Sequence, residues 1–336
     1  MLMLNKHVAN KRHWVIAGKI ILAAMLIAIL LSKGSLDFRS ISGVTARLDL
    51  FIPALLCLFA GLLISGLRWW ILLIVSDHKI HLKTVLSLQL MGSFFSTWLP
   101  GASGGDAVRG IQIFRLLESG RSTALISIIT DRVFALLGLI SIAAIVSLFL
   151  PAQLTHSAAL ASYVSLIKVI GFGTVFSLVL GLAFIWLTLR FSLLEYIPVK
   201  IRTYLNILLA TTLIYRKKWP ALAFCWLLSM LASGIVVIGI VLIAAIFPYA
   251  PNPMISAIAG VFGNVFSAIP ATPGGLGVGE SIFAKICADF SARTAPFATI
   301  YFTFRVGMLI ANIPGMIVTL LYNHSKHQEM ARSGRS

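Results

Sequence analysis

The sequence has 336 residues, and only 11% of them are charged, whereas about 25% of the residues of a soluble domain are charged. Hydrophobic residues make up 59% and recur in runs along the whole chain, which excludes a separate soluble domain and predicts a single membrane domain over residues 1–336. The basic residues behind the formal net charge of +17 cluster between these runs, so they indicate loops beside anionic lipid rather than a nucleic-acid-binding surface.

Six apolar runs are long enough to cross a hydrocarbon core of about 30 Å, which takes about 20 helical residues. They are Trp14–Leu31, Leu50–Val75, Ser122–Leu150, Ala161–Leu189, Trp219–Phe247 and Pro296–Tyr322. The first run follows a basic start and lacks a cleavage site, so we interpret it as a retained span rather than a signal peptide. The three cysteines lie in apolar segments without a short spacing, so we expect no disulfide, no metal site and no cofactor.

Two further apolar regions are each interrupted by proline and a glycine pair, at Leu99–Gly105 and at Ile269–Gly275. The arms that flank each interruption would form helices of roughly 22 Å, which is shorter than a full span. We therefore predict two re-entrant helical hairpins, whose irregular tips must be surrounded by protein or by a watery cavity.

The loop charges favour the same topology. With a cytoplasmic N-terminus and hairpins that return to their own side, most loop Lys and Arg fall inside, and the outer loops hold only Lys33, Arg39, Arg47 and Arg293. We therefore predict an all-α polytopic protein of the cytoplasmic membrane with six transmembrane helices and two re-entrant hairpins, and with both termini cytoplasmic. The helices form inverted repeats of about 14–150 and 161–322, as in many transporters, where broken helices meet near the midplane.

Charged residues in or near the membrane are the candidates for a substrate site, because a charge at bilayer depth must pair or serve a function. They are Asp106, Arg109, Asp131, Arg132, Glu280 and Arg305. We favour a function for the arginines, since guanidinium binds phosphate in a bidentate geometry. For the carboxylates, a structural ion pair and a function stay open. Asp106, one helical turn before Arg109, is a candidate structural partner for it.

The glycine pairs Gly104–Gly105 and Gly274–Gly275 suit an anion. A helix restarts after each pair, so its N–H groups point at the break, and glycine lets a ligand approach the backbone. The alternative is that these glycines only permit the turn and close packing. Ser103 and Thr272 are candidate N-caps for the restarting helices. In the arm before the second break, Asn264 and Ser267 share one face, for which helix packing is the favoured role.

The predicted substrate-binding site has no catalytic and no metal-binding residue. It consists of Gly104, Gly105, Asp106, Arg109, Asp131, Arg132, Gly274, Gly275, Glu280 and Arg305.

At the two breaks the sequence resembles a known family. Leu99–Arg109, the pair Asp131-Arg132 and Ile269–Glu280 are similar to the membrane domain of bacterial lysylphosphatidylglycerol synthases, and the resemblance covers nearly the whole chain. It implies a flippase for aminoacylated phosphatidylglycerol. Only a short, mostly polar segment follows Tyr322, where the full synthases continue into an acyltransferase domain, so the resemblance does not extend to synthetic activity.

We therefore expect a translocator, not an enzyme, that moves a phosphate-bearing lipid of the phospholipid or polyprenyl type between leaflets. Its partners would be membrane lipids with anionic or phosphate-bearing headgroups, and a homo-oligomer or a separate lipid-modifying enzyme stays open as a further partner. One alternative is a secondary transporter of a small polar solute, which predicts a cavity sealed from lipid. Another is a lipid-modifying enzyme, which needs a nucleophile or base that the sequence does not display. A third is a membrane partner of a separate synthase.

Overall fold

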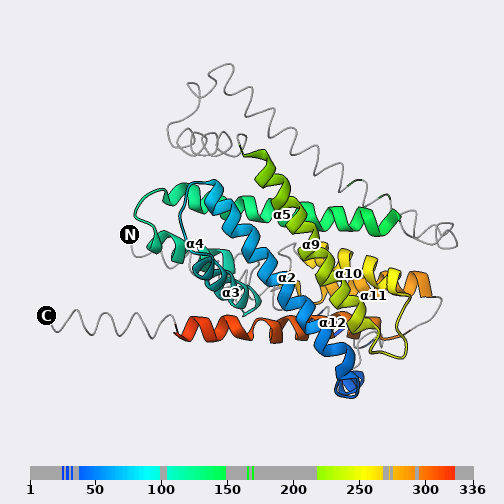
Figure 1. The fold of residues 1–336 in the computed structure, drawn as a ribbon. Coiled ribbons are helices and arrows are strands. Elements are labelled where there is room, and N and C mark those ends of the chain that lie inside the picture. Colours follow the sequence, from blue (N-terminus) through cyan, green and yellow to red (C-terminus); the bar gives the residue numbers. More distant parts are fainter. Residues whose placement is uncertain are drawn as a thin grey trace, which may run out of the picture. The chain divides into compact units, whose positions relative to one another are not determined.

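The computed structural model describes residues 38–98, 104–148, 218–267, 275–291 and 295–321, together with Thr272 and a few single positions. Every regular element in these ranges is helical, which confirms the all-α prediction (Figure 1). The elements are η1 (Phe38–Arg47), α2 (Leu48–Val75), α3 (Leu82–Trp98), α4 (Gly104–Leu116), α5 (Arg121–Leu148), α9 (Trp219–Ala244), α10 (Pro253–Ser267), α11 (Val278–Ser291) and α12 (Phe297–Ala311).

Four helical segments of the described chain are long and apolar enough to cross a membrane. They are Gly43–Val75, Arg121–Val146, Trp219–Ala244 and Phe297–Leu321. The last one includes α12, a single turn residue at Asn312 and a further helical stretch, 313–321. These segments correspond to four of the six predicted runs, so the protein has the helices of a multi-pass membrane protein.

The other two predicted runs, Trp14–Leu31 and Ala161–Leu189, lie outside the described residues apart from single positions. The total of six spans and the repeats at 14–150 and 161–322 therefore stay predictions.

Each predicted interruption separates two short helices. The first separates α3 and α4, of 17 and 13 residues, and the second separates α10 and α11, of 15 and 14 residues. At 1.5 Å per residue these helices are about 20–26 Å long, which is less than a hydrocarbon core of about 30 Å. The short paired helices are present as predicted, whereas their re-entrance into the membrane stays a prediction.

Glycine permits close helix packing at the first break. A Cβ atom added at Gly105 would overlap the carbonyl oxygen of Gly92 and the hydroxyl of Ser96, so a larger residue at the start of α4 would push α3 away. The close-packing role considered for this glycine pair therefore holds at Gly105.

The helices around the second break meet at one aromatic ring. Helix α10 packs against α11, and α11 packs against α12. Cβ atoms added at Gly263 of α10 or at Gly279 of α11 would collide with the ring of Tyr301 on α12. Helix α10 starts at Pro253 because the preceding Asn252 accepts the N–H of Met254 through Oδ1 at 2.9 Å, an N-cap followed by proline at the first helical position.

The chain forms two compact units, each built from segments of both sequence halves. The first contains the residues up to Ala60, Leu90–Val108 and the residues from Ile235 onward. The second contains Gly61–Gln89 and Arg109–Gly234. Each of the two clusters of charged side chains described next lies within one unit.

Candidate substrate-binding site

Three charged side chains form a buried cluster in the second unit, which we name the Arg–Asp–Arg triad: Arg68 of α2, Arg109 of α4 and Asp131 of α5. Arg68 donates through Nε to Oδ1 of Asp131 at 2.8 Å. Arg109 donates through Nη2 to the other carboxylate oxygen, Oδ2, at 3.1 Å. All three side chains are at most 4% exposed. One carboxylate thus ties together three helices and carries two guanidinium partners.

Neutral side chains hold the two arginines in place. Arg68 also donates through Nη1 to the hydroxyl of Ser229 on α9, at 3.0 Å. The guanidinium carbon of Arg109 lies 3.9 Å from the centroid of the buried ring of Trp69, within the range of a cation–π interaction. The indole N–H of Trp69 in turn donates to the hydroxyl of Ser127 at 3.0 Å. Both guanidinium groups are therefore held by a contact with a neutral side chain as well as by their ion pair with Asp131.

A second cluster lies in the first unit, where Arg305 of α12 faces the second break. Its Nε lies 2.5 Å from Oε1 of Glu280 on α11. Its Nη2 donates to the carbonyl of Gly275 at 2.6 Å and to the hydroxyl of Ser267 at 2.9 Å. One guanidinium group therefore joins the last residue of α10, the loop after the break and the first turn of α11.

Glu280 has a second role at the start of α11. Its Oε2 accepts the backbone N–H of Gly277 at 2.8 Å, and Gly277 directly precedes the first helical residue. A Glu at the third helical position that reaches back to this N–H forms half of a capping box. One of the N–H groups that were predicted to bind a phosphate is thus bound by the carboxylate of Glu280.

The Thr272 N-cap prediction is wrong. Helix α11 begins only at Val278, and the hydroxyl of Thr272 donates to the carbonyl of Leu276 at 2.8 Å. Gly275 and Gly277 lie in the turns between Thr272 and Val278. Their φ angles of 69° and 81° are in the left-handed region of backbone conformation, which favours glycine. Ser103, the other predicted cap, lies outside the described residues.

The polar face predicted on α10 takes part in the second cluster. The hydroxyl of Tyr301 donates to Oδ1 of Asn264 at 2.9 Å and lies 3.3 Å from the hydroxyl of Ser267. The guanidinium carbon of Arg305 lies 5.4 Å from the centroid of the Tyr301 ring. Asn264 and Ser267 thus pack against α12, the role favoured for them. Their contacts are polar, because Asn264 binds Tyr301 and Ser267 binds Arg305.

The two clusters repeat one arrangement with opposite polarity. In each, the helix that restarts after a break is joined to the next long helix by an ion pair whose carboxylate is buried. At the first break the restarting helix carries the cation, Arg109, and the long helix carries the anion, Asp131. At the second break the restarting helix carries the anion, Glu280, and the long helix carries the cation, Arg305.

The remaining predicted site residues that the structure describes are Gly104, Gly105 and Asp106 of α4 and Arg132 of α5. Gly104 and Asp106 are half-buried in the first turn of α4, and Asp106 has a polar or ionic contact of its own. Arg132 is exposed, although its neighbour Asp131 is buried. Gly274 lies outside the described residues.

The predicted site did not include Arg68, Trp69, Ser229 or Tyr301. A signal existed only for Arg68, since a basic residue in the middle of an apolar run requires a partner or a function. The other three are ordinary span residues by type, and only the fold shows what they contact.

The apolar spans and the two buried charged clusters define a polytopic helical membrane protein with ion-paired side chains in its interior. The chain belongs to the family described as lysylphosphatidylglycerol synthase TM region, whose model matches residues 15–315. This match confirms the family resemblance, and it indicates a lipid-related function in a membrane. No curated protein and no solved structure matched the chain in the corresponding comparisons.

Proposed function

We propose that the protein translocates a phosphate-bearing lipid between the leaflets of the cytoplasmic membrane. The observation that carries this proposal is the guanidinium group of Arg109, which lies in the helix that restarts after the first break and shares the carboxylate of Asp131 with Arg68. Guanidinium suits phosphate oxygens, and the family match supports a lipid as the source of the phosphate. The proposed activity needs no catalytic residue and no cofactor.

Arg109 is the arginine that can exchange its partner at the lowest cost. When its Nη2 leaves Asp131, that carboxylate keeps the shorter bond from Arg68. Asp131 would then remain paired, and the penalty of a buried lone anion is avoided. Arg305 differs, because its release would strip Glu280 of its ion pair and open the loop at Gly275. We therefore assign headgroup binding to Arg109 and a structural role to Arg305.

Replacing Arg109 by Gln is expected to reduce lipid translocation at least tenfold, with the protein still folded because Arg68 and Asp131 remain as a neutral pair. The measurement is the movement of a fluorescent phospholipid across proteoliposomes that contain the full chain. Arg109→Lys is expected to keep part of the rate, since an ammonium group makes no bidentate contact. The matched control is Arg121→Gln, in which an exposed arginine of α5 is removed, and its rate should equal that of the unchanged protein.

A well-folded Arg109→Gln variant that translocates at the full rate would remove this residue from the site. Uptake of a soluble solute without lipid movement would favour a secondary transporter instead. Mass spectrometry of the lipids that copurify with the protein would then name the lipid, or show that none is retained.

We also propose that both termini are cytoplasmic, on the support of the bias in loop charge. Single cysteines at Lys217 and Ser333 should therefore react with a membrane-impermeant thiol reagent only from the cytoplasmic side, and one at Gln153 only from the outside. The background is a variant in which the three native cysteines are replaced. Labelling of position 217 from the outside would contradict both this orientation and the inverted repeats built on it.

A further inference from the structure

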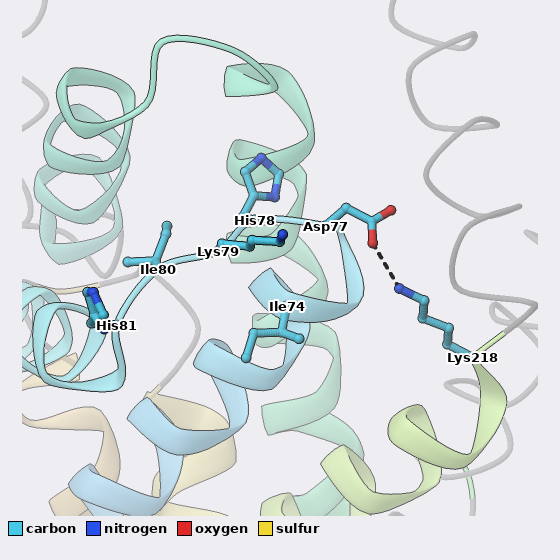
Figure 2. Close-up of a pocket in the computed structure, with 7 residues that line it drawn as sticks. All are labelled: Ile74, Asp77, His78, Lys79, Ile80, His81 and Lys218. Carbon is cyan, nitrogen blue, oxygen red and sulfur yellow. Dashed lines mark hydrogen bonds and ion pairs between the residues drawn. The ribbon is translucent and has the colours of Figure 1, made fainter.

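A cavity of about 460 Å³ lies at the junction of α2, α3 and α9, apart from the charged clusters described above. Figure 2 shows its lining, which comes from the end of α2, from the loop to α3 and from the residue that precedes α9. The lining residues are Ile74, Asp77, His78, Lys79, Ile80, His81 and Lys218. We name this cavity the loop pocket.

The loop pocket lies where a membrane protein meets lipid headgroups. It sits at the end of one span, α2, and at the start of another, α9. Trp219, the first residue of α9, is 70% exposed directly beside Lys218. Exposed tryptophan at the end of a span is typical of the membrane interface, where the indole ring sits at headgroup level.

The electrostatics of the loop pocket favour an anion. Lys79, His81 and Lys218 contribute basic groups, and Asp77 is paired with Lys218 at 3.0 Å (Figure 2). His81 directly precedes α3, whose first N–H groups have no partner within the helix.

The carbonyls that end α2 would repel an anion, but they are already bound. The backbone N–H groups of Asp77 and His78 bond back to the carbonyls of Ile74 and Leu73, and Nζ of Lys218 donates to the carbonyl of Val75 at 3.1 Å. The negative end of this helix is thus neutralised within the protein.

His78 adds a buried polar atom to the pocket. Its side chain is only 7% exposed, and its Nε2 lies 3.0 Å from the carbonyl of Gly120, so Nε2 carries the proton. Within the described part of the chain, its Nδ1 has no hydrogen-bond partner. In this tautomer Nδ1 is a hydrogen-bond acceptor, so a hydroxyl group of a bound headgroup would satisfy it.

We propose that the loop pocket binds the phosphate of an anionic lipid headgroup at the membrane face. Lys79, Lys218 and His81 surround the phosphate, and Ile74 and Ile80 contact the apolar part of the lipid that follows it. This docking site is independent of translocation, because it does not use Arg109 or Arg305.

The test measures binding of dioctanoyl phosphatidylglycerol to the full chain in detergent by titration calorimetry. Lys79→Gln should weaken binding about fivefold, the effect of one basic residue near an anionic headgroup. Asp77→Asn should tighten it about two- to fivefold, because Lys218 is released and a negative charge is removed. Asparagine also tolerates the positive φ of 61° at this position.

The matched control is Lys83→Gln, which removes an exposed lysine of α3 that does not line the pocket and should leave binding unchanged. The titrations are made in the Arg109→Gln background, which removes headgroup binding at Arg109, so a failure of docking can be told apart from a failure of translocation. Equal losses in Lys79→Gln and Lys83→Gln would overturn the proposal in favour of diffuse surface attraction. Equally tight binding of dioctanoyl phosphatidylcholine, or of inorganic phosphate, would overturn recognition of an anionic lipid.

Discussion

Replacing Asp131 by Asn is expected to lower the free energy of unfolding by about 3–5 kcal/mol, as for other buried ion pairs that lose one partner. The substitution removes the negative charge to which both Arg68 and Arg109 are bound. Two buried cations would then face each other across a neutral amide. Thermal unfolding of the full chain in detergent measures the loss as a lower midpoint temperature.

The control for Asp131 is Asp49→Asn, which breaks an ion pair with Arg47 on the surface and should leave the midpoint unchanged. The double variant Asp131→Asn with Arg109→Gln should regain part of the loss, because only one buried cation then remains. An Asp131→Asn protein as stable as the Asp49→Asn protein would show that the triad does not hold these helices together.

Replacing Arg305 by Gln is expected to destabilise the second break by a similar amount, about 3–5 kcal/mol. Glu280 would stay buried without its cation, and the carbonyl of Gly275 and the hydroxyl of Ser267 would lose a donor. The effect should be local, so hydrogen exchange of the backbone N–H groups at 275–280 should accelerate most. Arg305→Lys should restore only part of the protection, because one ammonium group does not span all three partners.

Lys285→Gln is the matched control on α11, since Lys285 forms an exposed ion pair with Asp289 one turn away. This pair should contribute little, and exchange at 275–280 should not change. Combining Arg305→Gln with Glu280→Gln removes both charges of the pair and should be less damaging than Arg305→Gln alone. If exchange in Arg305→Gln accelerates evenly over the whole chain, the ion pair stabilises the global fold rather than the break.

The helices and their breaks could be predicted from the sequence because their signals are local. Four predicted spans correspond to described helices, and most of their end residues differ from the observed ends by only a few positions. This agreement arises because each residue of an apolar run adds to the same preference for lipid. The breaks at Leu99–Gly105 and Ile269–Gly275 could be located because proline and glycine end helices wherever they occur.

The pairing of the charges could not be predicted, because it depends on contacts between distant helices. Arg68 and Asp131 are 63 positions apart, and neither residue indicates the other in a single sequence. Asp106, one helical turn before Arg109, was a candidate partner for it, but no signal in the sequence pointed to Asp131, which lies 22 positions further on and binds Arg109. At the second break, the N-cap was assigned to Thr272 because hydroxyl side chains favour caps, and the turns at Gly275 and Gly277 moved the helix start to Val278.

The Arg–Asp–Arg triad also has a consequence for how the chain is made. Its members occur in the order Arg68, Arg109 and Asp131, so during synthesis both cations leave the ribosome before the anion that binds them. A charged residue at the centre of a helix costs about 2.5–3.5 kcal/mol on insertion into the bilayer. Until α5 has entered the membrane, this cost has no compensation from Asp131. We therefore expect the first 120 or so residues to insert into the membrane reversibly. The entry of α5 is then the step at which α2 and α4 become fixed in the membrane.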